Sequence, residues 1–117
     1  MEISDKTDNI KEERRGDVLV YRLKGRLDAV SAHVVEKSIF DAVDAGCNKV
    51  LNDLSLVTYL SSAGIRMCLA TTKKLRSLSG RLLICRTASN VLEVFKMSGF
   101  DHVLELFETE DEALRNF

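Results

Sequence analysis

The segment that decides the fold is Asp53-Leu54-Ser55-Leu56-Val57-Thr58-Tyr59-Leu60-Ser61-Ser62-Ala63-Gly64-Ile65. It overlaps an apolar run, residues 49–54, that predicts a buried strand. It leads into residues 62–79, where apolar side chains recur every three or four positions, as in a helix. Ser61 and Ser62 lie between the two. Serine is favoured at a helix N-cap, where its oxygen accepts a hydrogen bond from a free backbone N–H, so the first interpretation is a capped helix after a strand.

A second interpretation starts from the chemistry of a hydroxyl at a helix start. A phosphate there would lie beside free N–H groups and the positive end of the helix dipole, so the fold could tolerate it. A partner protein docked at the same place would meet about −1.5 to −2 units of new charge. The serine pair therefore also predicts a switch, in which the domain keeps its fold while its binding surface changes charge.

Length and composition limit the classes of protein to consider. A chain of 117 residues with 45% apolar and 30% charged residues is typical of one globular domain. The net charge is −1, without the basic stripe expected of a nucleic-acid binder. No apolar run approaches the roughly 20 residues that span a bilayer, and the N-terminus does not resemble a signal peptide. We therefore expect a cytoplasmic protein with no membrane span and no direct nucleic-acid partner.

The cysteines and histidines do not form a recognisable metal or redox motif. Cys47, Cys68 and Cys85 are too far apart for a Cys-x-x-Cys pair. Cys68 falls on the apolar face of its predicted helix and Cys85 at the end of an apolar run, so both are expected in the core. His33 and His102 have no ligand cluster at a useful spacing, and we expect neither a metal nor a cofactor.

Strands and helices alternate along the chain, which predicts an α/β domain with a mixed, mainly parallel sheet of four to five strands and about four helices. Residues 1–16 are predicted to form a tail or an antiparallel edge strand, and residues 17–117 a single domain. Ser31 is the predicted N-cap of the first helix, and Thr109 that of the last. The predicted strands are 18–23, 49–54, 81–85 and 102–107, and the predicted helices are 31–45, 62–79, 89–98 and a short one after Thr109.

Enzyme signatures are missing from the sequence. It has no Gly-x-Gly-x-x-Gly after the first clear strand and no Gly-Lys-Ser/Thr loop for a nucleotide. A nucleophilic Ser61 or Ser62 would need a glycine-flanked turn and a histidine base, but the flanking residues are leucine and alanine. Asp28 and Asp53 could form a carboxylate pair, although Asp53 is better explained as the cap of a strand end or loop. The sequence therefore favours a binding module over an enzyme.

The central segment also resembles the signature of bacterial anti-sigma-factor antagonists, single-domain members of the STAS group (sulfate transporter and anti-sigma factor antagonist). The resemblance covers about residues 17–115. It is carried by these residues: Gly25-Arg26-Leu27-Asp28, Asp53-Leu54-Ser55, Val57, Tyr59 to Ile65, Val91, Phe95, Ser98-Gly99-Phe100 and Glu112-Ala113-Leu114.

This resemblance implies a role in partner switching. Such an antagonist binds an anti-sigma factor that is also a serine kinase, which releases a sigma factor. Phosphorylation of a serine at the start of the second helix ends the binding until a serine phosphatase acts. By resemblance that serine is Ser62, with Ser61 as the alternative. The residues expected to contact the partner are Asp28, Ser61, Ser62, Ala63, Gly64 and Arg66.

Two positions differ from the family pattern: Ser61 replaces an aspartate, and Ala63 replaces a second hydroxyl residue. The first change makes Ser61 a rival phosphate acceptor. Two other functions also stay open at this point. One is a constitutive scaffold that uses the same surface without modification, and the other is a regulator that responds to a small molecule or nucleotide.

Overall fold

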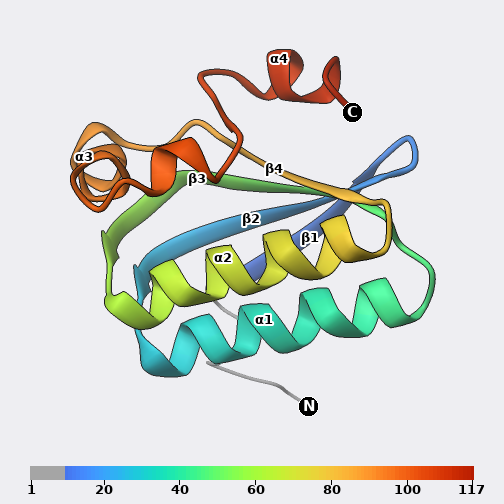
Figure 1. Ribbon diagram of the computed structural model, residues 1–117, viewed down its shortest axis with the longest axis horizontal. Helices are drawn as coiled ribbons and strands as arrows, with labels where there is room; N and C mark the ends of the chain where they lie inside the picture. The colour runs from blue at the N-terminus through green and yellow to red at the C-terminus, as the bar shows by residue number, and fades with distance from the viewer. Residues whose placement is uncertain (1–9) are drawn as a thin grey trace.

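A single five-stranded sheet, in the order β1-β2-β3-β4-β5, organises the computed structural model, which describes residues 10–117 (Figure 1). β2 to β5 run parallel to one another, while β1 pairs with β2 antiparallel. The mixed, mainly parallel sheet predicted from the sequence is confirmed. Residues 1–9 of the predicted tail or edge strand lie outside the described residues. The strands are β1 (Ile10–Arg15), β2 (Val18–Leu27), β3 (Lys49–Leu60), β4 (Arg81–Cys85) and β5 (Leu106–Phe107).

Helices cover both faces of the sheet, but unequally. The two long helices lie side by side on one face, and the short C-terminal helix lies on the other (Figure 1). The α/β class with about four helices is therefore also confirmed. The helices are α1 (Ala29–Asp44), α2 (Ser62–Ser77), α3 (Ser89–Met97) and α4 (Glu110–Leu114), with a 3-10 turn, η2 (Phe100–His102), after α3.

Alternating side chains of the central strands supply two apolar layers. On the face that α1 and α2 cover, Val50 and Leu54 of β3 join Tyr21 of β2 and Ile39 of α1 in the larger core. Each such fully buried apolar side chain contributes about 1.5–3 kcal/mol to folding. The smaller core, under α4, consists of Val18, Val20, Leu51, Leu83, Cys85 and Ala113.

The buried cysteines behave as the sequence predicts. Cys68 and Cys85 are both fully buried, and burial raises the pKa of each thiol to about 12. Both thiols therefore stay protonated at neutral pH and pack as small apolar side chains.

Four predicted boundaries are wrong. β2 continues to Leu27 instead of ending at Leu23. β3 continues to Leu60 instead of ending at Leu54, because β2 keeps pairing with it as far as Leu27, through two irregularities in register. α1 begins at Ala29, and its N-cap is Asp28 instead of Ser31. The Ser31 hydroxyl accepts a hydrogen bond from the Asp28 backbone N–H, so the two residues form a capping box. The last strand includes only Leu106–Phe107, because the chain before it turns through η2.

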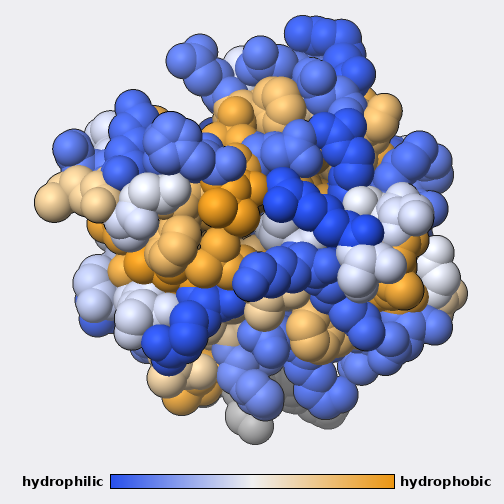
Figure 2. Space-filling model, in the orientation of Figure 1, coloured by the Kyte–Doolittle hydropathy of each residue, from blue (hydrophilic) through white to orange (hydrophobic). Residues whose placement is uncertain are grey.

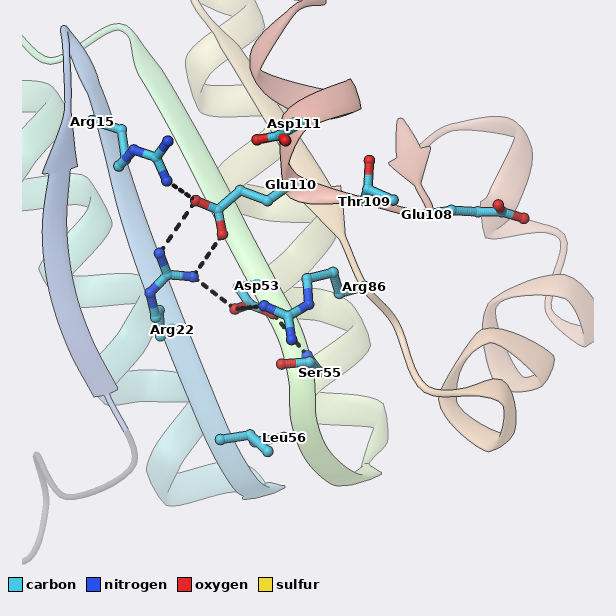
Figure 3. A pocket seen from close by; sticks show the side chains of 10 residues that line it. All are labelled: Arg15, Arg22, Asp53, Ser55, Leu56, Arg86, Glu108, Thr109, Glu110 and Asp111. Carbon is cyan, nitrogen blue, oxygen red and sulfur yellow. Dashed lines mark hydrogen bonds and ion pairs between the residues drawn. The ribbon is translucent and has the colours of Figure 1, made fainter.

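A charge cluster fastens α4 to the sheet (Figure 3). Arg22 Nη1 lies 2.9 Å from Asp53 Oδ2 and 2.8 Å from Glu110 Oε1, and Arg22 Nε lies 3.0 Å from Glu13 Oε2. Asp53 is buried within β3, so its predicted role as a cap of a strand end is wrong, and its partner is Arg22 rather than Asp28. The cluster joins β1, β2, β3 and α4 through one guanidinium group.

The cluster predicts how stability depends on pH. Hydrogen bonding to Arg22 lowers the pKa of Glu110 below its ordinary value of 4.5. A carboxyl group with a lowered folded pKa stabilises the fold above its unfolded pKa, and this stabilisation is lost as the pH falls through the folded pKa. We expect Glu110→Gln to lower the free energy of unfolding by about 1–3 kcal/mol at neutral pH. The free energy of unfolding of the variant should also fall less steeply as the pH is lowered.

Urea unfolding at neutral pH and at about pH 3 measures both effects. Glu108→Gln is the control, because Glu108 is an exposed neighbour on the same segment. If the free energy of unfolding decreased as much between neutral pH and about pH 3 in Glu110→Gln as in the parent chain, the stabilising role of the Glu110 carboxylate would be contradicted.

Candidate functional site

The candidate site lies where two parallel strands end and two helices begin. Arg26 and Leu27 at the end of β2 pair with Tyr59 and Leu60 at the end of β3. α1 begins directly after β2, and α2 directly after β3. The starts of both helices therefore come together at one end of the molecule (Figure 1), so side chains far apart in sequence share one surface.

Ser61 is part of the fold at this point. Its hydroxyl donates to the Leu27 carbonyl oxygen at 2.8 Å and accepts from the Gly64 N–H at 3.2 Å, as the N-cap of α2. Its backbone N–H also donates to the Leu27 oxygen, at 3.0 Å. The Ser61 hydroxyl thus uses its only proton to join the end of β2 to the start of α2.

Ser62 differs sharply from its neighbour. It is the first residue of α2, its side chain is exposed, and within residues 10–117 its hydroxyl makes no hydrogen bond. It lies at the positive end of the helix dipole, where negative charge is favourable. The hydroxyl accessible to another protein at this helix start is therefore that of Ser62.

Ala63 and Gly64 contribute mainly by being small. A Cβ on Gly64 would lie 2.7 Å from Leu60 Cδ1 and 2.8 Å from the Leu27 carbonyl oxygen, so only glycine lets α2 approach the ends of the strands this closely. Gly64 is buried and Ala63 packs against the core. Gly64 therefore positions the two serines, and its contact with a partner stays a prediction.

Asp28 caps α1 at the same end of the molecule. Its Oδ1 accepts from the backbone N–H groups of Val30 and Ser31, at 3.2 and 3.1 Å. These hydrogen bonds, that of the Ser31 N–H above all, lower the pKa of Asp28, so its carboxylate is ionised at neutral pH. The expected acidic residue is therefore present at the site, but it also has a structural task that the sequence analysis gave to Ser31.

Sequence reasoning missed three residues that give this surface its character. Val30 on the first turn of α1 is 66% exposed, and Tyr59 is 44% exposed. The Arg26 guanidinium lies 4.1 Å from the centre of the Tyr59 ring, a cation–π contact. Exposed apolar side chains at the end of the molecule where α1 and α2 begin are typical of a protein-binding surface. Together with the exposed Arg66, predicted from the sequence, these side chains form what we term the helix-start surface: Arg26, Val30, Tyr59, Ser62 and Arg66.

The described residues provide no cluster for metal chemistry. Residues 10–117 contain no group of three or more His, Cys, Asp or Glu side chains placed to hold a metal ion. His33 and His102 are both exposed. Over the same residues, no helix is long and apolar enough to cross a membrane.

Comparison with known proteins identifies the family. A model of the STAS domain matches residues 9–113, almost the whole chain. The chain belongs to the STAS domain family. The BtrV protein of Bordetella bronchiseptica, which is named as an anti-sigma factor antagonist, is 33% identical over 100 residues, covering 86% of each chain.

Solved structures show the same fold. A crystal structure of an anti-sigma factor antagonist from Mycobacterium paratuberculosis superposes with a TM-score of 0.83 at 25% identity, over 97% of this chain and 96% of that one. SpoIIAA of Bacillus has been solved unphosphorylated and phosphorylated, with TM-scores of 0.80 and 0.74 at 23% and 22% identity. The two SpoIIAA structures match 92% of this STAS domain and 94% and 97% of their own chains.

The structure gives a physical reason for one departure from the family pattern. Position 61, where the pattern has an aspartate, is the N-cap of α2. Aspartate and serine are both among the favoured N-cap residues because each offers an oxygen to a free backbone N–H. Ser61 therefore retains the capping function without the negative charge.

The two serines are predicted to respond differently to truncation. Ser61→Ala removes the cap of α2 and the hydrogen bond to Leu27, and should lower the free energy of unfolding by about 1 kcal/mol or more. Ser62→Ala removes an exposed hydroxyl without a partner and should change it by less than about 0.5 kcal/mol. Chemical denaturation of both variants measures the difference, and equal effects would contradict the assigned roles.

Gly64 gives a further test, in which two effects oppose each other. Alanine is favoured over glycine inside a helix by about 1 kcal/mol. The overlap with Leu60 and the Leu27 carbonyl should outweigh that preference, so we expect Gly64→Ala to be less stable by about 1–3 kcal/mol. A rise in melting temperature for Gly64→Ala would show that the close approach is not required.

Proposed function

We propose that this STAS domain is an anti-sigma-factor antagonist controlled by phosphorylation of Ser62. Without phosphate, it binds an anti-sigma factor that is also a serine kinase, and thereby releases a sigma factor. Phosphorylation of Ser62 by that kinase ends the binding, and a serine phosphatase restores it. The observation that supports this most directly is the contrast between Ser61, whose hydroxyl is used by the fold, and Ser62, whose hydroxyl is exposed and free.

The geometry favours Ser62 over Ser61 as the phosphate acceptor. A phosphate ester on Ser61 would lose the proton donated to the Leu27 carbonyl and would place negative charge beside that oxygen in a partly buried position. A phosphate on Ser62 would extend from the first turn of α2 toward solvent. There it would lie near the positive end of the helix dipole and one turn from Arg66. The fold can therefore accept the phosphate at Ser62.

The same phosphate would weaken a bound partner. Val30 and Tyr59 offer apolar contact at the end of the molecule that carries Ser62, while Arg26 and Arg66 offer positive charge. A complementary partner would therefore present apolar and acidic groups. A phosphate in that contact would face acidic groups and lose its hydration on binding, which costs several kcal/mol. The relatives named as antagonists, and SpoIIAA solved with and without phosphate, support this assignment.

The experiment compares the parent chain with Ser62→Ala and Ser61→Ala after incubation with the cognate kinase and ATP. Intact-mass analysis should show one phosphate on the parent chain and on Ser61→Ala, and none on Ser62→Ala. Binding of the kinase, measured by calorimetry, should be retained by Ser62→Ala and weakened about tenfold or more by Ser62→Asp. Unchanged phosphorylation of Ser62→Ala would reject the assignment.

One further outcome separates the switch from the scaffold. A constitutive scaffold would bind its partner equally well before and after kinase treatment.

Asp28→Asn isolates the charge of Asp28, because asparagine also caps helices well. If the partner contacts the Asp28 carboxylate, Asp28→Asn should weaken partner binding while leaving the melting temperature of the chain nearly unchanged. A pull-down from native cells should recover a small ATPase of the histidine-kinase type as the partner.

A further inference from the structure

The sheet face that carries α4 is covered only in part. α4 packs over β4, β5 and the portion of β3 around Leu51. Further along β3, Leu56 is 61% exposed, whereas the next residue, Val57, is buried in the larger core under α1 and α2. Because neighbouring side chains of a strand point to opposite faces, Leu56 lies on the α4 face. Figure 3 shows it at the far end of this face from α4, with no helix of residues 10–117 in front of it.

Leu56 borders a pocket of about 330 Å³ between β1, β2 and β3. Among the described residues that line this pocket, Lys11, Arg22 and Lys24 are basic, and Asp53 is the only acidic one. The Asp53 side chain is 4% exposed and its Oδ2 lies 2.9 Å from Arg22 Nη1, so the charges of this pair balance. The pocket therefore combines exposed apolar surface with a positive rim. Its volume is at the lower end of the range for ligand pockets, about 300–1,000 Å³, which leaves room for one or two apolar side chains.

Arg86 adds positive charge on the β4 side of Leu56. It follows β4 directly, its side chain is 48% exposed, and it lines a second pocket that Leu56 also borders. The backbone φ of Arg86 is +60°, a left-handed conformation that favours glycine and is costly for a residue with a side chain. The exposed acidic residues of the second pocket, Glu108 and Asp111, lie at the α4 end of the face in Figure 3, opposite Leu56.

Arg26 and Tyr59 connect this area with the helix-start surface. Their neighbours Leu27 and Leu60 are buried in the larger core, so the Arg26 and Tyr59 side chains point to the α4 face. There the Arg26 guanidinium stacks on the Tyr59 ring. We term the whole area the bare sheet face: Lys11, Lys24, Arg26, Leu56, Tyr59 and Arg86.

The charge of the bare sheet face indicates what would cover it. Four of its six residues are basic and none is acidic. The acidic neighbour on β1 is Glu13, which lies 3.0 Å from Arg22 Nε and 3.5 Å from Lys11 Nζ. A positive face around an exposed leucine complements an acidic segment that carries an apolar residue. Tyr59 is the only aromatic residue of the face and Arg26 stacks on it, so the face lacks the row of free rings on which single-stranded nucleic acids stack.

A second apolar area lies elsewhere on the molecule. Figure 2 shows hydrophobic side chains gathered beside α3, over the region of η2 and β5. The charged residues that line the pocket there, Lys96, Asp101 and Glu108, have both signs. That area therefore does not favour a partner of one charge, whereas the bare sheet face does.

We propose that the bare sheet face binds an acidic segment of a partner protein, with one apolar side chain of that segment in the pocket beside Leu56 and its carboxylates near Lys11 and Arg86. This contact goes beyond the proposed function, because it uses a different face from Ser62 and requires no phosphorylation. An apolar residue that fills a pocket inside a polar rim is the usual energetic centre of a protein interface. Salt screens exposed charges, so the binding should weaken as the ionic strength rises.

The test titrates the ¹⁵N-labelled full chain with three short peptides. The first has a leucine and a phenylalanine between two runs of glutamate and aspartate; the second has serines in place of the apolar pair, and the third has lysines in place of the acidic runs. We expect saturable amide shifts centred on Lys11, Leu56 and Arg86, with the first peptide bound about tenfold or more tightly than the others. No saturable shifts, shifts centred elsewhere, or equal binding of either other peptide would overturn the proposal.

Variants with matched controls sharpen the test. Leu56→Ser should weaken binding of the first peptide about tenfold and leave the melting temperature nearly unchanged, because the side chain is exposed. Leu78→Ser, which removes a 53% exposed leucine at the end of α2, should not change the binding. Lys11→Gln should also weaken it, whereas Arg14→Gln, on the opposite face of β1, should not. Equal effects of a variant and its control would overturn the proposal.

Two rival occupants of the bare sheet face would give different results. A second copy of the chain would raise the sedimentation coefficient with protein concentration, and Leu56→Ser would remove that rise. A single-stranded oligothymidine would shift the same amides and bind more tightly than the first peptide. Either result would overturn the proposal.

Discussion

The Leu27 carbonyl oxygen holds together the end of this STAS domain where α1 and α2 begin. It accepts hydrogen bonds from both the N–H and the hydroxyl of Ser61, and the backbone of Gly64 packs against it. These contacts join the last residue of β2 to the first turn of α2. Because the hydroxyl of Ser61 is used in this junction, the hydroxyl of Ser62 is displayed at the surface. One constraint therefore both stabilises the fold and selects the exposed serine.

Charged side chains divide into those that hold the fold together and those that face outward. Arg22 contacts Glu13, Asp53 and Glu110, so its positive charge is balanced within the molecule and fastens α4 to the sheet. Arg26 and Arg66 are instead exposed, Arg26 near the end of β2 and Arg66 one turn after Ser62 in α2. Since paired charges on the α4 face are already satisfied, they offer less to a partner than the charges of the helix-start surface.

Local sequence patterns predicted those parts of the fold that short-range physics controls. The apolar runs gave β2, β3 and β4, and the three- and four-residue spacing gave α2, whose predicted start at Ser62 matches the structure. Errors occurred where long-range pairing decides. β3 extends by six residues beyond its predicted end because β2 lies alongside it, and a partner strand cannot be seen in the strand's own sequence. The N-cap of α1 was predicted at Ser31 and is Asp28. Both residues belong to one capping box, and the sequence alone does not indicate which of the two is the N-cap.

Residue types at short spacing were enough to predict the α/β class and the serine pair at a helix start, and to show that common enzyme signatures are missing. It also carried the resemblance to the STAS family. Tertiary structure alone decided which serine is free, because the answer depends on Leu27, which lies far from Ser61 in the chain. It alone decided that Val30 and Tyr59 are exposed at the end of the molecule where α1 and α2 begin. Apolar residues pack inward by default, so an apolar residue on the surface becomes evident only once the whole chain is folded.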